Sequence, residues 1–104
     1  MSQALQIHET MEDDVHVLTL EGHIDTITAS ILDNVGRRIQ SADRTAKIMV
    51  DLGQCTFISS AGLRVIITIQ KRAMMGGSLM FRNAKPEVMD VFEATGFDGI
   101  LAID

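Results

Sequence analysis

The feature that most constrains this fold is an alternation of short aliphatic segments with longer segments of helical periodicity. Helical patterns fill the three intervals that follow the second aliphatic segment. A strand, a helix and a further strand in succession predict a crossover connection and parallel pairing. We therefore expect an α/β fold with a mixed β-sheet, helices mainly on one face, and the order β-β-α-β-α-β-α-β. The predicted strands cover residues 5–8, 15–20, 47–52, 79–81 and 100–103.

The first two strands are expected to pair antiparallel. The acidic segment 11–14 between them predicts a short hairpin turn, and Gly22 is predicted to end the second strand. The next segment has apolar residues at every fourth position, with Leu32 beside them, which predicts one buried stripe on a helix. Asp25 or Thr26 could cap the start of that helix. The stripe consists of Ile27, Ile31, Val35 and Ile39.

Two further helices are expected, each ended by glycine. The second begins at Ser59 or Ser60 and ends at Gly76-Gly77, while the third has Pro86 in its first turn and ends at Gly96. Their predicted apolar faces are Leu63, Ile66, Ile67 and Met74 on the second helix, and Val88, Val91, Phe92 and Thr95 on the third. The predicted core includes Ile31, Val35, Val50, Ile66, Ile67 and Phe92.

Composition limits the possible function classes. The chain has 104 residues, as expected for one domain, and nine basic against fourteen acidic residues give a formal net charge of −5. That charge disfavours direct nucleic-acid binding. The single Cys55 cannot form an internal disulfide or a multi-cysteine metal site, and it fits a reducing compartment. Neither a secretory signal nor a long apolar run is evident, so we expect a cytoplasmic protein without membrane insertion.

Sequence signatures of enzymes are mostly missing. His8, His16 and His23 do not have metal-ligand spacing, and the sequence contains no GxSxG element. Gly76-Gly77-Ser78 ends a predicted helix and so does not resemble a phosphate-binding loop. We therefore predict no catalytic residue, no metal and no cofactor. An enzyme with Ser60 as nucleophile remains open as an alternative, because a catalytic triad is defined by geometry.

The segment 57–63, Phe-Ile-Ser-Ser-Ala-Gly-Leu, lies between a predicted strand and a predicted helix. The first turn of a helix has unpaired backbone N–H groups, so Ser59 or Ser60 is a natural N-cap. Ala61 and Gly62 are small and could let another protein approach the backbone closely. The alternative is purely structural: Ser59 is the cap, Ser60 is an exposed first-turn residue, and Gly62 permits packing of the helix on the sheet.

Residues 58–63 resemble the signature of the STAS family, roughly apolar-Asp-Ser-Ser/Ala-Gly-Leu, and residues 22–25 match its Gly-x-x-Asp feature. The resemblance covers essentially the whole chain and implies an anti-sigma factor antagonist, a bacterial signalling protein. Such a protein binds an anti-sigma factor that is also a serine kinase, is released when that kinase phosphorylates it, and is restored by a PP2C-type phosphatase. The resemblance places the phosphorylation site at Ser60, with Ser59 as the rival. It implies a partner-binding surface of Gly22, Asp25, Ser59, Ala61 and Gly62.

The sequence departs from the family pattern at two places. Ser59 replaces the usual Asp, which preserves a helix cap but removes a carboxylate beside the target hydroxyl. Many relatives have a further helix after the last strand, so we expect a single STAS domain over residues 1–104 that lacks this helix, or a sequence that covers only part of the protein. A monomer or weak dimer is expected. The alternative function is a STAS scaffold that is not phosphorylated, in a stress-signalling assembly or a lipid-transport complex.

Overall fold

A computed structural model describes residues 5–99 and 101–103. The observed order of helices and strands matches the predicted one, apart from a short 3-10 turn, η1 (Phe97–Gly99), before the last strand. The strands are β1 (Gln6–Glu12), β2 (Val15–Ile24), β3 (Lys47–Ile58), β4 (Ser78–Arg82) and β5 (Ala102–Ile103), and the helices are α1 (Ala29–Ala42), α2 (Ser60–Ala73) and α3 (Pro86–Thr95).

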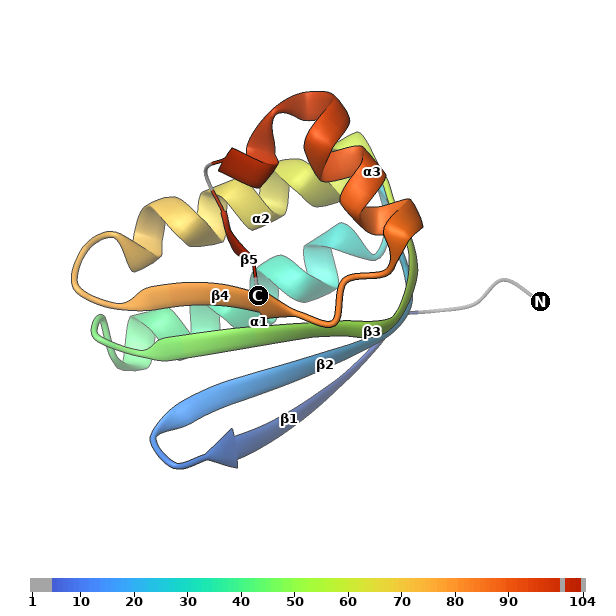
Figure 1. Ribbon diagram of the computed structural model, residues 1–104. Helices are drawn as coiled ribbons and strands as arrows, with labels where there is room; N and C mark the ends of the chain where they lie inside the picture. The colour runs from blue at the N-terminus through green and yellow to red at the C-terminus, as the bar shows by residue number, and fades with distance from the viewer. Residues whose placement is uncertain (1–4, 100, 104) are drawn as a thin grey trace.

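The five strands form one mixed sheet in the order β1-β2-β3-β4-β5. The strands β1 and β2 pair antiparallel through a tight turn at Asp13-Asp14, and the remaining pairs are parallel. Each parallel pair is joined by one helix, and all three helices cover the same face of the sheet (Figure 1). The predicted mixed α/β fold is therefore confirmed.

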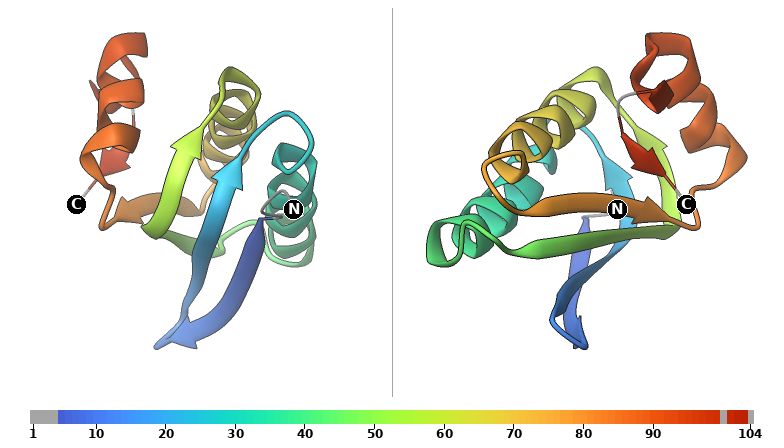
Figure 2. Two further views of the ribbon diagram at one scale, coloured as in Figure 1. Left: turned by 90° about the vertical axis from the view of Figure 1, so that its right-hand side faces the viewer. Right: turned by 60° about the vertical axis from the view of Figure 1, so that its left-hand side comes forward.

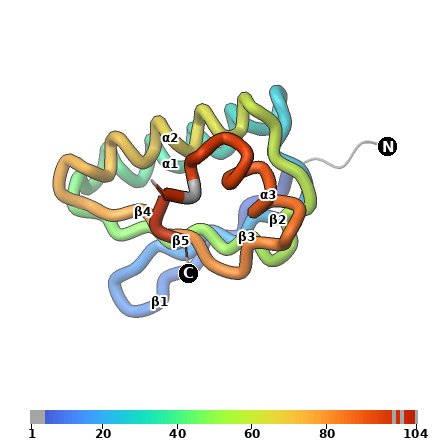
Figure 3. Tube along the Cα trace, turned by 45° about the horizontal axis from the view of Figure 1, so that its top comes forward, coloured from blue at the N-terminus to red at the C-terminus, as the bar shows by residue number. Residues whose placement is uncertain are grey.

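The core lies between the sheet and this helical layer. Helices α1 and α2 run side by side, whereas α3 stands apart from them and packs on β3 (Figures 2 and 3). Phe81 of β4 meets Phe92 of α3 with ring centroids 6.0 Å apart, and both side chains are fully buried. The predicted core positions Val50, Ile66 and Phe92 are confirmed.

The buried face of α1 matches the predicted stripe only at Ile39, together with Leu32 beside it. Ile27 is 79% exposed and Ile31 is 40% exposed, while Val35 is only partly buried. The helix begins at Ala29, after Ile27, and a spacing of four residues drifts around a helix that has 3.6 residues per turn. The residues that face the core are Ala29, Leu32, Gly36, Ile39 and Gln40.

Three further burial predictions need correction. Met74 is 75% exposed because α2 ends at Ala73 and Met74 is its C-cap. Thr95, in the last turn of α3, is exposed, and its hydroxyl donates to the Val91 carbonyl 2.9 Å away. Ile67 packs against the core but is only partly buried.

Strands β2 and β3 are both longer than predicted. β2 does not end at Gly22 but continues to Ile24. Its pairing with β3 is irregular on both sides of Gly22, and such an irregularity lets a strand bend without ending. Gly22 has φ +118°, which glycine adopts without a Cβ penalty. β3 continues to Ile58 beside it, so residues 53–58 are strand and not the predicted connection. The last strand was predicted over 100–103; β5 is Ala102–Ile103, and residue 100 lies outside the described residues.

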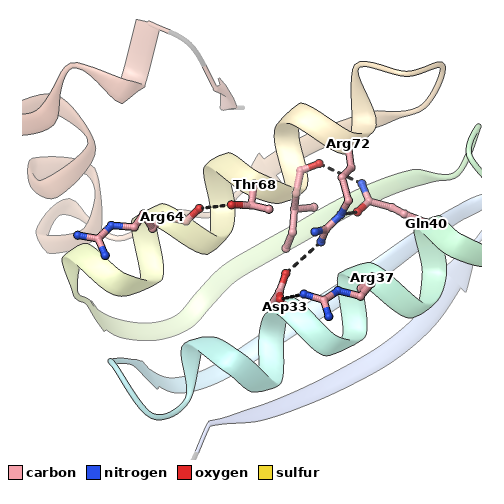
Figure 4. Close-up of polar contacts among 7 residues, drawn as sticks. Asp33, Arg37, Gln40, Arg64, Thr68 and Arg72 are labelled. Carbon is pink, nitrogen blue, oxygen red and sulfur yellow. Dashed lines mark hydrogen bonds and ion pairs between the residues drawn. The ribbon is translucent and has the colours of Figure 1, made fainter.

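A polar cluster joins α1 to α2 along their exposed edge (Figure 4). Asp33 accepts from Arg37 at 2.6 Å and from Arg72 at 3.1 Å. The buried Gln40 accepts from Arg72 Nε at 2.8 Å and donates to the Ile69 carbonyl at 3.0 Å. These contacts fix the two helices against each other. Within the described part of the chain, no helix is long and apolar enough to span a membrane.

The burial pattern predicts a contrast between two isoleucines. Ile66 is 1% exposed, so Ile66→Ala should lower the free energy of unfolding by about 2 to 5 kcal/mol. Ile27→Ala, at an exposed position, should change it by less than about 0.5 kcal/mol. Urea denaturation of both variants measures this contrast, and similar losses for the two would mean that the α1 face has been assigned incorrectly.

Candidate functional site

The two sequence motifs meet at one edge of the sheet. β2 and β3 are parallel and end together, with Ile24 paired to Ile58, so the residues that follow them emerge side by side. The Ser59 backbone N–H donates to the Ile24 carbonyl at 2.8 Å. The first turns of α1 and α2 consequently begin next to each other, which brings Asp25 and Ser60 to the same end of the molecule.

The two serines at the start of α2 have different environments. Ser59 is the N-cap, in extended backbone conformation, and its hydroxyl accepts from the Gly62 N–H at 3.2 Å. Ser60 is the first residue of the helix and is exposed to solvent. The expected division between a capping Ser59 and an exposed Ser60 therefore matches the geometry. Of the two hydroxyls, that of Ser60 is the more accessible.

Two of the small residues assigned to the partner surface are buried instead. A Cβ atom on Gly62 would lie 2.7 Å from Ile24 Cγ2 and 3.1 Å from the Ile24 carbonyl oxygen, so Gly62 faces the sheet. Gly22 is also buried, at the irregularity in β2. Both glycines therefore lie in the interior beneath the site, where they fix the course of the backbone, and they do not form part of its surface. Ala61, which is half-buried, keeps a place at the surface.

Asp25 organises the turn that leads into α1. Its Oδ1 accepts from the backbone N–H groups of Ile27 at 3.0 Å and Thr28 at 2.9 Å. In return, the Asp25 N–H donates to the Thr28 hydroxyl at 2.8 Å, and that hydroxyl donates to the His23 carbonyl at 2.7 Å. The Thr28 N–H and hydroxyl, followed by the Ile27 N–H, hold the pKa of Asp25 below its ordinary value. Asp25 thus caps the turn that precedes α1. The N-cap of the helix itself is Thr28, whose side chain makes no cap hydrogen bond, and not Asp25 or Thr26 as the sequence predicted.

Large apolar side chains around this edge are exposed. Besides Ile27 and Ile31, Phe57 at the end of β3 is 49% exposed, and its ring packs edge-on against His23 with centroids 5.9 Å apart. The helical periodicity of the sequence predicted the two isoleucines to be buried, and nothing in the sequence predicted a surface role for Phe57. Ile27 precedes α1, which begins at Ala29, and Ile31 lies off the buried face of that helix.

Two shallow hollows flank the first turns of α2. One lies between α1 and α2 and has a volume of about 370 Å³, with Ala61 and Arg64 among its lining residues. The other, of about 280 Å³, lies between α2 and the segment after α3, and Ser60, Leu63 and Phe97 line it. Among the described residues, no three His, Cys, Asp or Glu side chains gather as a metal site. The surface is therefore a shallow, mixed apolar and polar face.

The tight contact at Gly62 predicts a sensitive position. Gly62→Ala should destabilise the fold by about 1 to 3 kcal/mol through overpacking against Ile24, even though alanine favours helix by about 1 kcal/mol over glycine. Gly99→Ala is the matched control, since a Cβ atom there meets nothing within 4 Å. Thermal unfolding measures both variants, and a Gly62→Ala protein as stable as wild type would contradict this packing.

The Asp25 turn predicts a pH dependence. A carboxyl whose folded-state pKa is lowered contributes stability above its unfolded pKa of about 3.9 and loses that contribution as the pH falls through the lowered value. Asp25→Asn should therefore reduce the fall in stability that wild type shows below about pH 4. Urea midpoints of both proteins, measured between neutral and acid pH, test this, and parallel curves would show that Asp25 does not contribute.

Comparisons with known proteins agree with this geometry. The family model described as "Mlab, STAS domain" matches residues 7–102. BtrV of Bordetella bronchiseptica, assigned by name to the anti-sigma factor antagonists, is 31% identical over 93 residues, which are 88% of this chain and 78% of BtrV. An anti-sigma factor antagonist structure from Mycobacterium paratuberculosis has a TM-score of 0.84 at 20% identity, covering 99% of this chain and 89% of that one. The phosphorylated form of Bacillus SpoIIAA has a TM-score of 0.72 at 16% identity, covering 97% and 91%. The chain belongs to the STAS domain family.

Proposed function

We propose that this protein is an anti-sigma factor antagonist that binds a serine-kinase anti-sigma factor and is released when the kinase phosphorylates Ser60. The observation that carries the proposal is the division of roles at the start of α2. The Ser59 hydroxyl is engaged as the helix cap, while Ser60 is exposed at a rigid helix end beside a flat, partly apolar surface. The protein is the substrate of the kinase and acts by binding, in the cytoplasm.

The similarity to known proteins supports the same function. BtrV is assigned by name to this class, and one structure of the same fold is of a phosphorylated member. Phosphoryl transfer depends mostly on positioning of the acceptor hydroxyl. An exposed serine at the first position of a helix meets that need, because the helix fixes its backbone and its small neighbour Ala61 leaves room for a kinase active site.

The surface around Ser60 has the composition of a docking site. Exposed Ile27, Ile31 and Phe57 provide apolar area, and Ala61 lines the hollow between α1 and α2. Interfaces take much of their binding energy from a few apolar anchors at the centre. A phosphate on Ser60 adds about 1.5 to 2 negative charges to this area, and burying that charge in an interface weakens binding strongly. A PP2C-type phosphatase that removes the phosphate would restore binding.

Phosphorylation should occur at Ser60 and not at Ser59. Incubation with the partner kinase and ATP, followed by peptide mass spectrometry, locates the label. Ser60→Ala should abolish labelling and give constitutive binding, and Ser60→Asp should weaken binding on the order of tenfold or more, since each 1.4 kcal/mol is tenfold in affinity. Ser59→Ala is the matched control: it should lower stability by about 0.5 to 2 kcal/mol through loss of the cap and leave labelling at Ser60. Label on Ser59 would move the site by one residue.

A second candidate function is a STAS scaffold that is never phosphorylated. It is favoured by Ser59, which stands where the family signature has an Asp, so that no carboxylate adjoins the target hydroxyl. The same experiment separates the two functions. Absence of label on both serines, together with normal partner binding by Ser60→Asp, would reject the switch and favour the scaffold.

A further inference from the structure

Arg64 lies one helical turn after Ser60 on the exposed side of α2. Residues four apart on a helix are neighbours, with Cβ atoms about 5 to 6 Å apart. Long side chains on a helix also lean toward its N-terminus, which directs Arg64 back toward the first turn. Figure 4 shows the guanidinium in that position, at the N-terminal end of α2 and apart from the Asp33 cluster. Arg64 also borders both hollows that flank this part of α2.

The guanidinium of Arg64 has no partner among the described residues, whereas most other arginines have one. Arg37 and Arg72 bind Asp33, Arg38 binds Glu9, and Arg82 binds Asp51 and Glu12. To none of the residues that the structure describes does the Arg64 side chain make an ion pair or hydrogen bond; its backbone carbonyl accepts from the Thr68 hydroxyl. Asp33, which lines the same hollow as Arg64, is already engaged by two arginines, and Asp25 is engaged by its own turn.

We propose that Arg64 is the residue that holds the phosphate of phosphorylated Ser60, as an intramolecular phosphate clamp. This inference rests on the proposed phosphorylation of Ser60. A phosphoserine offers three acceptor oxygens, and a guanidinium binds such a group through two parallel hydrogen bonds. While Ser60 carries only a hydroxyl, the Arg64 charge stays free on the docking surface. Arg64 therefore gains an internal partner only in the phosphorylated state.

The clamp changes the docking surface in two ways at once. Phosphorylation adds negative charge, and the new ion pair withdraws the positive charge that Arg64 presents to a partner. The local charge passes from +1 to about −0.5 to −1, as follows from a phosphate charge of about −1.5 to −2. A kinase surface with acidic groups opposite Arg64 would lose an attractive contact and meet a repulsive one, so release would exceed the effect of the phosphate alone.

The test places phosphoserine at position 60 by genetic encoding in the full chain, so that it does not depend on any kinase. Phosphorus NMR titration then gives the second pKa of the phosphate, which an adjacent cation lowers. Arg64→Gln should raise this pKa by about 0.3 to 1 unit relative to the wild-type phosphoprotein, and Arg64→Lys should recover part of the difference. In the unphosphorylated chain, Arg64→Gln should leave the melting temperature unchanged.

The matched control is Arg44→Gln. Arg44 is also exposed and has no side-chain partner among the described residues, but it lies between α1 and β3, at the opposite end of β3 from Ser60. This variant should leave the phosphate pKa unchanged. An identical pKa in the wild-type and Arg64→Gln phosphoproteins would overturn the clamp, whether or not a kinase labels Ser60. Failure of kinase labelling would instead count against the proposed function.

Discussion

The site depends on the close contact between the start of α2 and the end of β2. The Ser59 N–H donates to the Ile24 carbonyl, and Gly62 presents only a hydrogen atom to the Ile24 side chain. With a side chain at position 62, α2 would have to move away from the sheet. The contact fixes where α2 begins, which of the two serines caps it, and how near that turn lies to the turn of Asp25. The interior packing of α2 against β2 therefore fixes the geometry of the exposed turns that form the site.

Much of the fold follows from local patterns in the sequence. The element order, the parallel pairing and the glycine end of α3 were predicted because periodicity and the crossover rule act on short segments. The start of α1 was not predicted, because the turn capped by Asp25 occupies residues 25–28 and leaves Ile27 exposed before the helix. The lengths of β2 and β3 were also missed. They depend on pairing across the irregularity at Gly22, which a local pattern does not contain.

The sequence identified most residues of the candidate site, but it identified fewer of the roles that these residues have. Ser60 and Asp25 were singled out by their motifs, and the structure brings them to one end of the molecule. Gly62 was placed at the surface because it is small, and Gly22 because it belongs to the Gly-x-x-Asp feature. Both are buried: Gly62 lies close against Ile24, and Gly22 has φ +118° at the irregularity in β2. Phe57 and Arg64 lie outside the family signature, and their significance appears only when the end of β3 and the first turns of α2 place them near Ser60. A surface made by neighbouring turns cannot be recognised from any one of its segments.

The face of the sheet opposite the helices contains an ion bridge. Arg82 of β4 donates to Asp51 of β3 and reaches Glu12 at the end of β1, 70 residues earlier in the chain. The pairs β2–β3 and β3–β4 are each joined by a single helix, whereas this bridge needs four strands in place. The bridge can form only after these strands have paired, and pairings between segments so distant in sequence form slowly. The bridge should therefore form after the folding barrier has been crossed. Its strength should then affect the unfolding rate and have little effect on the folding rate.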